Sequence, residues 1–230
     1  MDKRVNFVFL HVGEDIRPYF LVKSIKKFFP RASIYQCTDL TTKAIEGVNN
    51  VFRYKGDTSN LMTYRLEVFS KLAINEYAIY LDTDMLIFNH FNLDRYKEFD
   101  AVLCERSFNK DNLISIEKNK GIDLYEYEGK TLFDVYPYLA CFTIAKSFHF
   151  WTECLNILMK LDKKFHYWYG DQEALRIIKV TNILNIGKVS ESDYACLPEY
   201  VDINTMPYIV HFKNKRRKQM MLEVANKYLT

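Results

Sequence analysis

"YAIYLDTDMLIF", residues 77–88, places two carboxylates one residue apart in an otherwise hydrophobic run. A charge removed from water costs roughly several kcal/mol unless a cation or hydrogen bonds neutralise it. Side chains at i and i+2 of a strand point to the same side, so Asp82 and Asp84 can face one ion while Thr83 faces away. Alternatively, both carboxylates cap backbone N–H groups in a turn. The stretch therefore predicts a buried strand that ends at a metal site or at a capped turn.

Length and composition favour one domain over residues 1–230. The chain has 230 residues, of which 49% are hydrophobic, and no Pro-, Gly- or Ser-rich linker divides it. Its 32 basic and 29 acidic residues nearly balance, which does not favour nucleic acid as a general partner. No run is long enough to span a bilayer, and the first apolar stretch is too short for a signal peptide. We expect a cytoplasmic protein with, at most, peripheral membrane contact.

The cysteines support the same compartment. They form no Cys-x-x-Cys pair, are odd in number and lie mostly among apolar neighbours: Cys37, Cys104, Cys141, Cys154 and Cys196. This pattern is typical of reduced thiols in a protein core.

Strand and helix patterns alternate along the chain. The expected strands are 5–10, 32–37, 50–54, 77–82, 101–104, 138–145 and 208–212, and the expected helices are 18–29, 60–74, 148–161, 170–179 and about 215–229. The polar stretch 105–130 is expected to be a loop over the site. Alternation of this kind predicts an α/β fold with a mostly parallel sheet covered on both faces. Such sheets bind ligands at the carboxyl ends of their strands, where Asp82 and Asp84 lie.

The last helix is basic at its start and amphipathic after it. Its apolar residues could rest on an anionic membrane that carries a lipid-linked acceptor, or could dock on the domain. Docking is the favoured interpretation.

Three separate features suggest one site. They are the pair Asp82 and Asp84, the strand-end His211, and a cationic cluster composed of Lys213, Lys215, Arg216, Arg217 and Lys218. Two carboxylates and an imidazole suit manganese, whereas an all-oxygen set favours magnesium or calcium. A nearby basic cluster suggests a phosphate-bearing ligand. Taken singly, His211 can be a core histidine and the cluster a solvated helix start.

In combination, these motifs resemble the GT-A glycosyltransferases, above all the family of glycogenin and the bacterial lipooligosaccharide galactosyltransferases. The matches are "YLDTD" for the Asp-x-Asp strand end, Arg65 on the preceding helix, Asp171-Gln172 at a later helix start, His211-Phe212, and Arg217 six residues after the histidine. The resemblance implies a single GT-A, Rossmann-like domain with a mostly parallel mixed sheet flanked by helices. The implied metal ligands are Asp82, Asp84 and His211. The implied nucleotide-binding residues are His11, Arg65, Asp82, Thr83, Lys213 and Arg217.

The same resemblance implies a metal-dependent transferase that favours Mn²⁺ over Mg²⁺. It would move a sugar from a nucleotide-diphosphate donor, UDP-linked by expectation, to a glycan, lipid-linked or protein acceptor, with Asp171 and Gln172 on the sugar side and a retaining outcome. An inverting enzyme instead needs a carboxylate base, for which Asp171, Asp111 or Glu117 would serve.

The chain departs from the family at several positions. Leu139-Ala140-Cys141 replaces Asn-Ala-Gly or Asn-Ser-Gly, Asn214 replaces a glycine, and "HVGED" from His11 replaces the usual acidic and aromatic pattern at the base site. The donor sugar and the base are therefore open.

Two other functions are considered. A phosphatase of the haloacid dehalogenase type also carries Asp-x-Asp after a strand, but usually after the first strand. A sugar-nucleotide or glycan-binding module without turnover would keep the metal site. The aromatic stretch "FHYWYGD", residues 165–171, is either a sugar-stacking surface or core packing.

Overall fold

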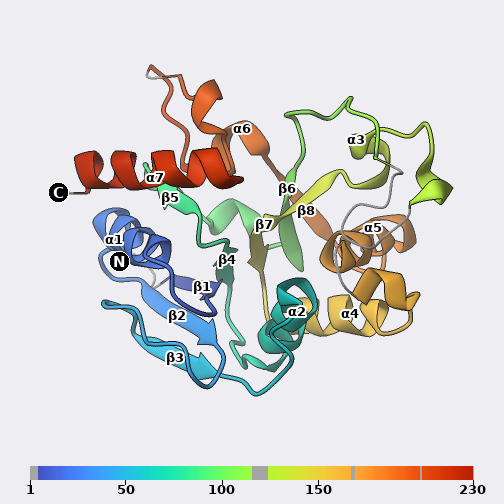
Figure 1. Ribbon diagram of the computed structural model, residues 1–230, viewed down its shortest axis with the longest axis horizontal. Coiled ribbons are helices and arrows are strands. Elements are labelled where there is room, and N and C mark those ends of the chain that lie inside the picture. Colours follow the sequence, from blue (N-terminus) through green and yellow to red (C-terminus); the bar gives the residue numbers. More distant parts are fainter. Residues whose placement is uncertain (1–4, 116–123, 167–168, 203, 230) are drawn as a thin grey trace.

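A computed structural model describes residues 5–115, 124–166, 169–202 and 204–229 (Figure 1). Within these residues, one sheet of seven strands has the order β3-β2-β1-β4-β7-β6-β8. The strands are β1 (Asn6–Leu10), β2 (Ser33–Thr38), β3 (Asn50–Arg53), β4 (Ala78–Leu81), β6 (Ala101–Glu105), β7 (Tyr138–Ala145) and β8 (Ile186–Ser190). All neighbours pair in parallel except β7, which is antiparallel to both β4 and β6. The predicted mostly parallel mixed sheet is confirmed.

Helices cover both faces of this sheet. Alternate residues of a strand point to opposite faces, so Val8 and Tyr80 belong to one core cluster, and Phe7 and Ile79 belong to the other. The first cluster is covered by α2 (Leu61–Lys71), α4 (His149–Leu158) and α5 (Gly170–Thr181), and the second by α1 (Arg17–Phe28). Strands buried on both faces read as continuous apolar runs, which is why the sequence pattern was easy to recognise.

The first helix, Arg17–Phe28, begins and ends within one residue of the predicted range 18–29. Pro18 stands in the first turn, where its missing N–H costs no intrahelical bond, and Lys26 and Lys27 stand in the last turn. The helix ends at Phe28, two residues before Pro30.

A second, two-stranded sheet was not foreseen. β5 (Met85–Ile87) pairs antiparallel with β9 (Ile209–His211), and Met85 lies opposite His211. The sequence predicted that the strand 77–82 ends at Asp82, within one residue of its observed end at Leu81, but not that the chain turns at residues 82–84 and starts a new strand. β8 was also missed, because its short pattern "IGKVS" contains a glycine and a lysine.

The C-terminal helix α7 (Lys215–Tyr228) docks on the domain, as expected. Met221 and Ala225 are buried in a third cluster that includes Phe20 of α1 and Leu86 of β5. Figure 1 shows α7 lying beside α1 and β5. Docking therefore uses the apolar stripe that a membrane would otherwise contact. Of the helices in the described residues, none is long and apolar enough to cross a bilayer.

The predicted loop 105–130 is partly structured. Leu113 forms an antiparallel bridge with Thr131, and a short 3₁₀ helix spans Tyr125–Tyr127. Within this segment Ile114, Leu124 and Tyr127 are buried, because they pack into the first core cluster. Two short helices follow later, α3 (Leu132–Val135) and α6 (Glu191–Tyr194). Glu117 lies outside the described residues.

Candidate active site

The two aspartates and the histidine meet at the carboxyl end of β4. Asp82, Thr83 and Asp84 connect β4 to β5, and His211 ends β9. The backbone N–H of Phe212 donates to the carbonyl of Asp84 at 2.8 Å, which holds the end of β9 against this turn. One ligand atom from each of Asp82, Asp84 and His211 lies within 4.8 Å of the others. The β5–β9 pairing therefore brings together residues that are more than a hundred positions apart in sequence.

This arrangement fits a divalent cation. His211 Nε2 lies 3.3 Å from Asp84 Oδ1, so the imidazole and the carboxylate are in direct contact. The other ring nitrogen, Nδ1, is buried without a hydrogen-bond partner among the described residues. Two carboxylates and one imidazole are a donor set that binds transition-metal ions such as Mn²⁺. The three residues could hold a metal.

Burial and charge act differently on the two aspartates. Burial raises the pKa of Asp82, and the neighbouring Arg65 only partly opposes this effect. Burial also acts to raise the pKa of Asp84, but the hydrogen bond and charge of His211 and the charge of Lys218 outweigh it, so this pKa is lowered. The pKa of His211 is raised, because Cys141 and Asp84 favour the cation more than burial opposes it.

Two cations approach Asp84: Lys218, from the predicted cationic cluster, and Arg17, which the sequence analysis missed. Lys218 Nζ lies 3.2 Å from Asp84 Oδ2, and Arg17 Nη1 lies 4.0 Å from the same oxygen. Arg17 follows β1 and begins α1, so it lies at the edge of the sheet where parallel strands end. That position after a strand was the signal that could have identified it.

Arg65 links two acidic residues of the candidate site. Its Nη1 donates to Asp82 Oδ1 at 2.8 Å, and its Nη2 pairs with Asp171 Oδ2. The family resemblance implies a nucleotide-binding role for Arg65. In the structure the buried side chain joins the Asp82 carboxylate to the carboxylate at the start of α5, since both are stabilised by a nearby positive charge.

Asp171 and Gln172 lie in the first turn of α5. Tyr169 precedes the helix with a φ of 66°, and a Cβ on Gly170 would lie 2.3 Å from the Phe165 carbonyl oxygen, so only glycine fits there. With its amide oriented to satisfy both groups, Gln172 donates to the Tyr138 carbonyl at 2.8 Å and accepts from the Ala140 N–H at 3.1 Å. Gln172 is thus fixed against β7 at the position where the family motif differs.

Three of the five basic residues in the cluster after His211 pair with three different acids. Lys213 Nζ lies 3.7 Å from Glu191 Oε1, Arg217 pairs with Glu199, and Lys218 reaches Asp84. The predicted phosphate ligand Arg217 is therefore engaged away from the aspartates, while its neighbour Lys218 lies at them. The reason is helical geometry, because successive residues of α7 point about 100° apart.

The remaining predicted residues have less distinctive surroundings. His11 follows β1 and is buried, and burial lowers its pKa. Thr83 lies between the two aspartates and is half-buried. In the aromatic stretch, Phe165 is buried in the core, and Tyr169 stacks on Tyr136 with ring centroids 5.5 Å apart. Residues 167–168 lie outside the described residues.

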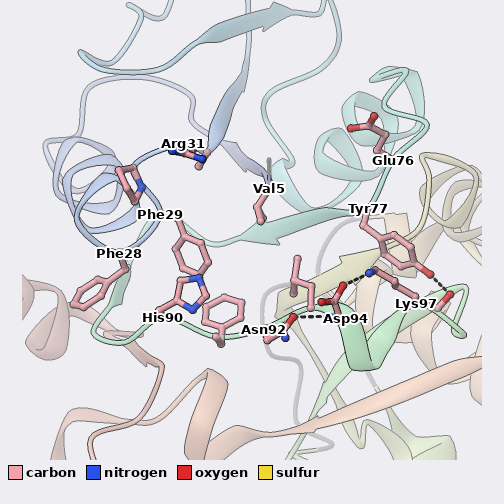
Figure 2. A pocket seen from close by; sticks show the side chains of 14 residues that line it. Val5, Phe28, Phe29, Arg31, Glu76, Tyr77, His90, Asn92, Asp94 and Lys97 are labelled. Atoms are coloured by element: carbon pink, nitrogen blue, oxygen red, sulfur yellow. Dashed lines mark hydrogen bonds and ion pairs between the residues drawn. The ribbon is translucent and has the colours of Figure 1, made fainter. Parts of the chain in front are cut away.

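A cavity of about 1310 Å³ lies at the opposite edge of the sheet (Figure 2). Val5 and Tyr77 precede β1 and β4 and line it together with Phe29 and His90, whose rings stack 4.6 Å apart. None of the predicted site residues lines this cavity. It is therefore separate from the site at the carboxyl end of β4.

Two solved structures match 97% of the chain at 13% sequence identity. The glycosyltransferase GlyE of Streptococcus pneumoniae TIGR4 superposes with a TM-score of 0.62, and the match covers 60% of the GlyE chain. An active-site mutant of LgtC superposes with a TM-score of 0.60, and the match covers 96% of that chain. This protein has a GT-A glycosyltransferase fold. It corresponds to about 60% of the length of the GlyE structure.

No protein-family model and no curated protein sequence matches the chain. At 13% identity the likeness concerns the GT-A fold. Within this fold, the Asp-x-Asp turn follows β4, the fourth strand of the chain, whereas the phosphatase alternative usually places the motif after the first strand.

Proposed function

We propose that this protein is a metal-dependent glycosyltransferase. It moves a sugar from a UDP-linked donor to a glycan, lipid-linked or protein acceptor, with retention at the anomeric carbon. The observation that supports this proposal is the convergence of Asp82, Asp84 and His211 in a GT-A fold, with ligand atoms within 4.8 Å of one another. The imidazole among the ligands favours Mn²⁺ over Mg²⁺.

Asp82, Asp84 and His211 would hold the ion. A bound metal of this kind supplies Lewis-acid stabilisation for the negative charge of a departing diphosphate. Lys218 and Arg17 lie at Asp84 and partly neutralise its charge. With a metal bound by Asp84, both cations would be placed to donate hydrogen bonds to phosphate oxygens.

Asp171 and Gln172 would act on the sugar side. The buried ion pair with Arg65 holds the Asp171 carboxylate in place. We expect a carboxylate engaged in this way to position the sugar and not to remove a proton from an acceptor hydroxyl, and the family resemblance implies retention. Gln172, held by the backbone of β7, is a fixed amide that can position sugar hydroxyls.

Thermal shift of the full chain tests the nucleotide and the metal together. UDP, GDP, ADP and CDP are each added with Mn²⁺, Mg²⁺ or a chelator. A ligand that binds only the folded state stabilises it, so UDP with Mn²⁺ should raise the melting temperature and the chelator should abolish the rise. Asp84→Asn should abolish it as well, whereas Asp94→Asn, an exposed residue near the remote cavity, should keep it.

Identical melting temperatures with every nucleotide and metal would contradict the proposal. Turnover separates an enzyme from a binding module. Release of UDP from a UDP-sugar should rise when an acceptor glycan is added, and the anomeric configuration of the product, measured by NMR, reports retention. A chain that binds UDP and Mn²⁺ but releases no UDP with any acceptor would support the binding module.

A further inference from the structure

Glu191 is a fully buried carboxylate that the proposed chemistry does not use. Its Oε2 accepts hydrogen bonds from the backbone N–H groups of Ser107 and Phe108, each at 2.7 Å. Its Oε1 has no hydrogen-bond partner among the described residues. One oxygen is thus satisfied, while the other leaves a buried charge only partly compensated, which is costly unless a cation lies near it.

The cation near Oε1 is Lys213. Its Nζ lies 3.7 Å away, which is within ion-pair distance but longer than a hydrogen bond. The Lys213 side chain remains 32% exposed. An ammonium group has three donors, so Lys213 can keep this ion pair and still present donors to solvent.

Lys213 is also tied to the candidate metal site by its backbone. It follows the metal-ligand candidate His211 by two residues. The N–H of His211 donates to the Cys196 carbonyl at 2.8 Å, and the N–H of Phe212 donates to the Asp84 carbonyl at 2.8 Å. The backbone hydrogen bonds at the end of β9 therefore fix the Cα of Lys213, and the Glu191 carboxylate attracts its ammonium group.

We propose that Glu191 is a positioning residue that holds the Lys213 ammonium where it meets the diphosphate of a bound nucleotide. The inference rests on the proposed function, because it concerns the same nucleotide. A tethered ammonium loses less conformational entropy when phosphate binds than a mobile lysine does. The two hydrogen bonds to Ser107 and Phe108 keep the carboxylate itself in place.

The direction in which UDP affinity changes when Glu191 is substituted distinguishes a positioning role from a purely electrostatic one. Removal of a negative charge near a diphosphate, by itself, strengthens binding, because like charges repel. Loss of a contact that positions Lys213 instead weakens binding of the diphosphate. Glu191→Gln removes the charge and keeps the size and an oxygen that can accept the N–H bonds of Ser107 and Phe108.

The experiment measures UDP affinity in the presence of Mn²⁺ by calorimetry. Full-length wild type, Glu191→Gln, Lys213→Met and the double variant are compared, with Glu223→Gln on the exposed side of α7 as the control. Glu191→Gln should weaken UDP binding by roughly three- to tenfold, the range of one charge-assisted contact. In the Lys213→Met background the same substitution should have no further effect, because it acts through that lysine.

Tighter binding by Glu191→Gln, an unchanged dissociation constant, or an equal loss in both backgrounds would each overturn the inference. Lys213→Met tests it independently if Glu191→Gln does not fold, since unaltered UDP affinity in that variant also overturns it. A wild-type chain that binds none of the nucleoside diphosphates with metal overturns the proposed function and this inference together. Wild-type binding with unchanged variants overturns the inference alone.

Discussion

The cationic side chains of the candidate site differ in the ion pairs that they form. Arg65 is engaged by Asp82 and Asp171, and Arg217 is engaged by Glu199. Lys218, the residue that follows Arg217 in the sequence, contacts Asp84 and not Glu199. The residue types were predictable from the sequence, but their partners were not, because a long cationic side chain can reach several acids.

Lys218 competes with a metal ion for Asp84. Lys218→Met should therefore increase the affinity for Mn²⁺ alone, by up to about fivefold, because a partly exposed ion pair contributes about 1 kcal/mol or less. Calorimetric titration with manganese chloride, without nucleotide, measures this. Arg217→Met is the matched control, and its affinity for Mn²⁺ should stay near that of the wild type. Equal changes in the two variants would show that overall charge, and not contact with Asp84, is responsible.

The contacts between elements create the site. β4 and β5 form one hydrophobic run in sequence, but a turn at Asp82, Thr83 and Asp84 divides them, and β9 pairs with β5 alone. The sequence pattern identified the run and the carboxylates within it. It could not identify the pairing with β9, because strand partners are chosen by packing across the whole molecule and not by local periodicity.

The C-terminal helix should depend on Met221 for its attachment. The Met221 side chain is fully buried against Phe20 and Leu86, so Met221→Ala should lower the free energy of unfolding by about 2 to 4 kcal/mol. Glu223→Ala, on the exposed side of the same helix, should change it by less than about 0.5 kcal/mol. Urea denaturation measures both. Equal effects would mean that α7 is held by its charges and not by its apolar stripe.

The turn after β2 should contribute a pH-dependent part of stability. Asp39 accepts hydrogen bonds from Thr41 and Thr42, and Thr42 Oγ1 in turn accepts from the Gly13 N–H at 2.7 Å, which links the ends of β2 and β1. The hydrogen bonds from Thr42, above all, lower the pKa of Asp39 to about 2. A lowered folded-state pKa stabilises the protein above the unfolded value of about 4, and this stabilisation disappears as the pH falls toward 2.

Asp39→Asn should therefore destabilise the protein at pH 6 and have less effect at pH 3. The difference in unfolding free energy between wild type and variant, measured by urea denaturation at both pH values, tests this. A difference that is the same at pH 6 and pH 3 would show that the carboxylate charge of Asp39 contributes nothing.

On the scale of the whole molecule, one sheet separates two apolar cores, and the candidate site lies at one edge of the sheet. The large cavity lies at the other edge, away from every predicted site residue. This division follows from the parallel strands, because their carboxyl ends all open on the same side. Cavity size by itself would have directed attention to the edge opposite the candidate site.

The five cysteines report on the integrity of both cores, since all of them are buried. Burial raises the pKa of the Cys37 and Cys154 thiols and raises that of Cys196 to about 11. A neutral, enclosed thiol reacts slowly, so the native protein should resist a thiol-specific disulfide reagent and react fully in denaturant. Spectrophotometric counting of reacted thiols measures this. Rapid reaction of the native protein would contradict the packing described here.

Local sequence patterns were enough to predict the alternation of strands and helices, the strand end at the Asp-x-Asp motif and the strand that carries His211. Apolar periodicity and residue type can be recognised within a few positions of the sequence. The β5–β9 pairing, the ion pair between Arg65 and Asp171, the contact of Lys218 with Asp84 and the place of Glu191 emerged only from the folded chain. Each of these joins residues that are distant in sequence. Their proximity depends on how helices and strands pack together, and no short stretch of sequence carries that information.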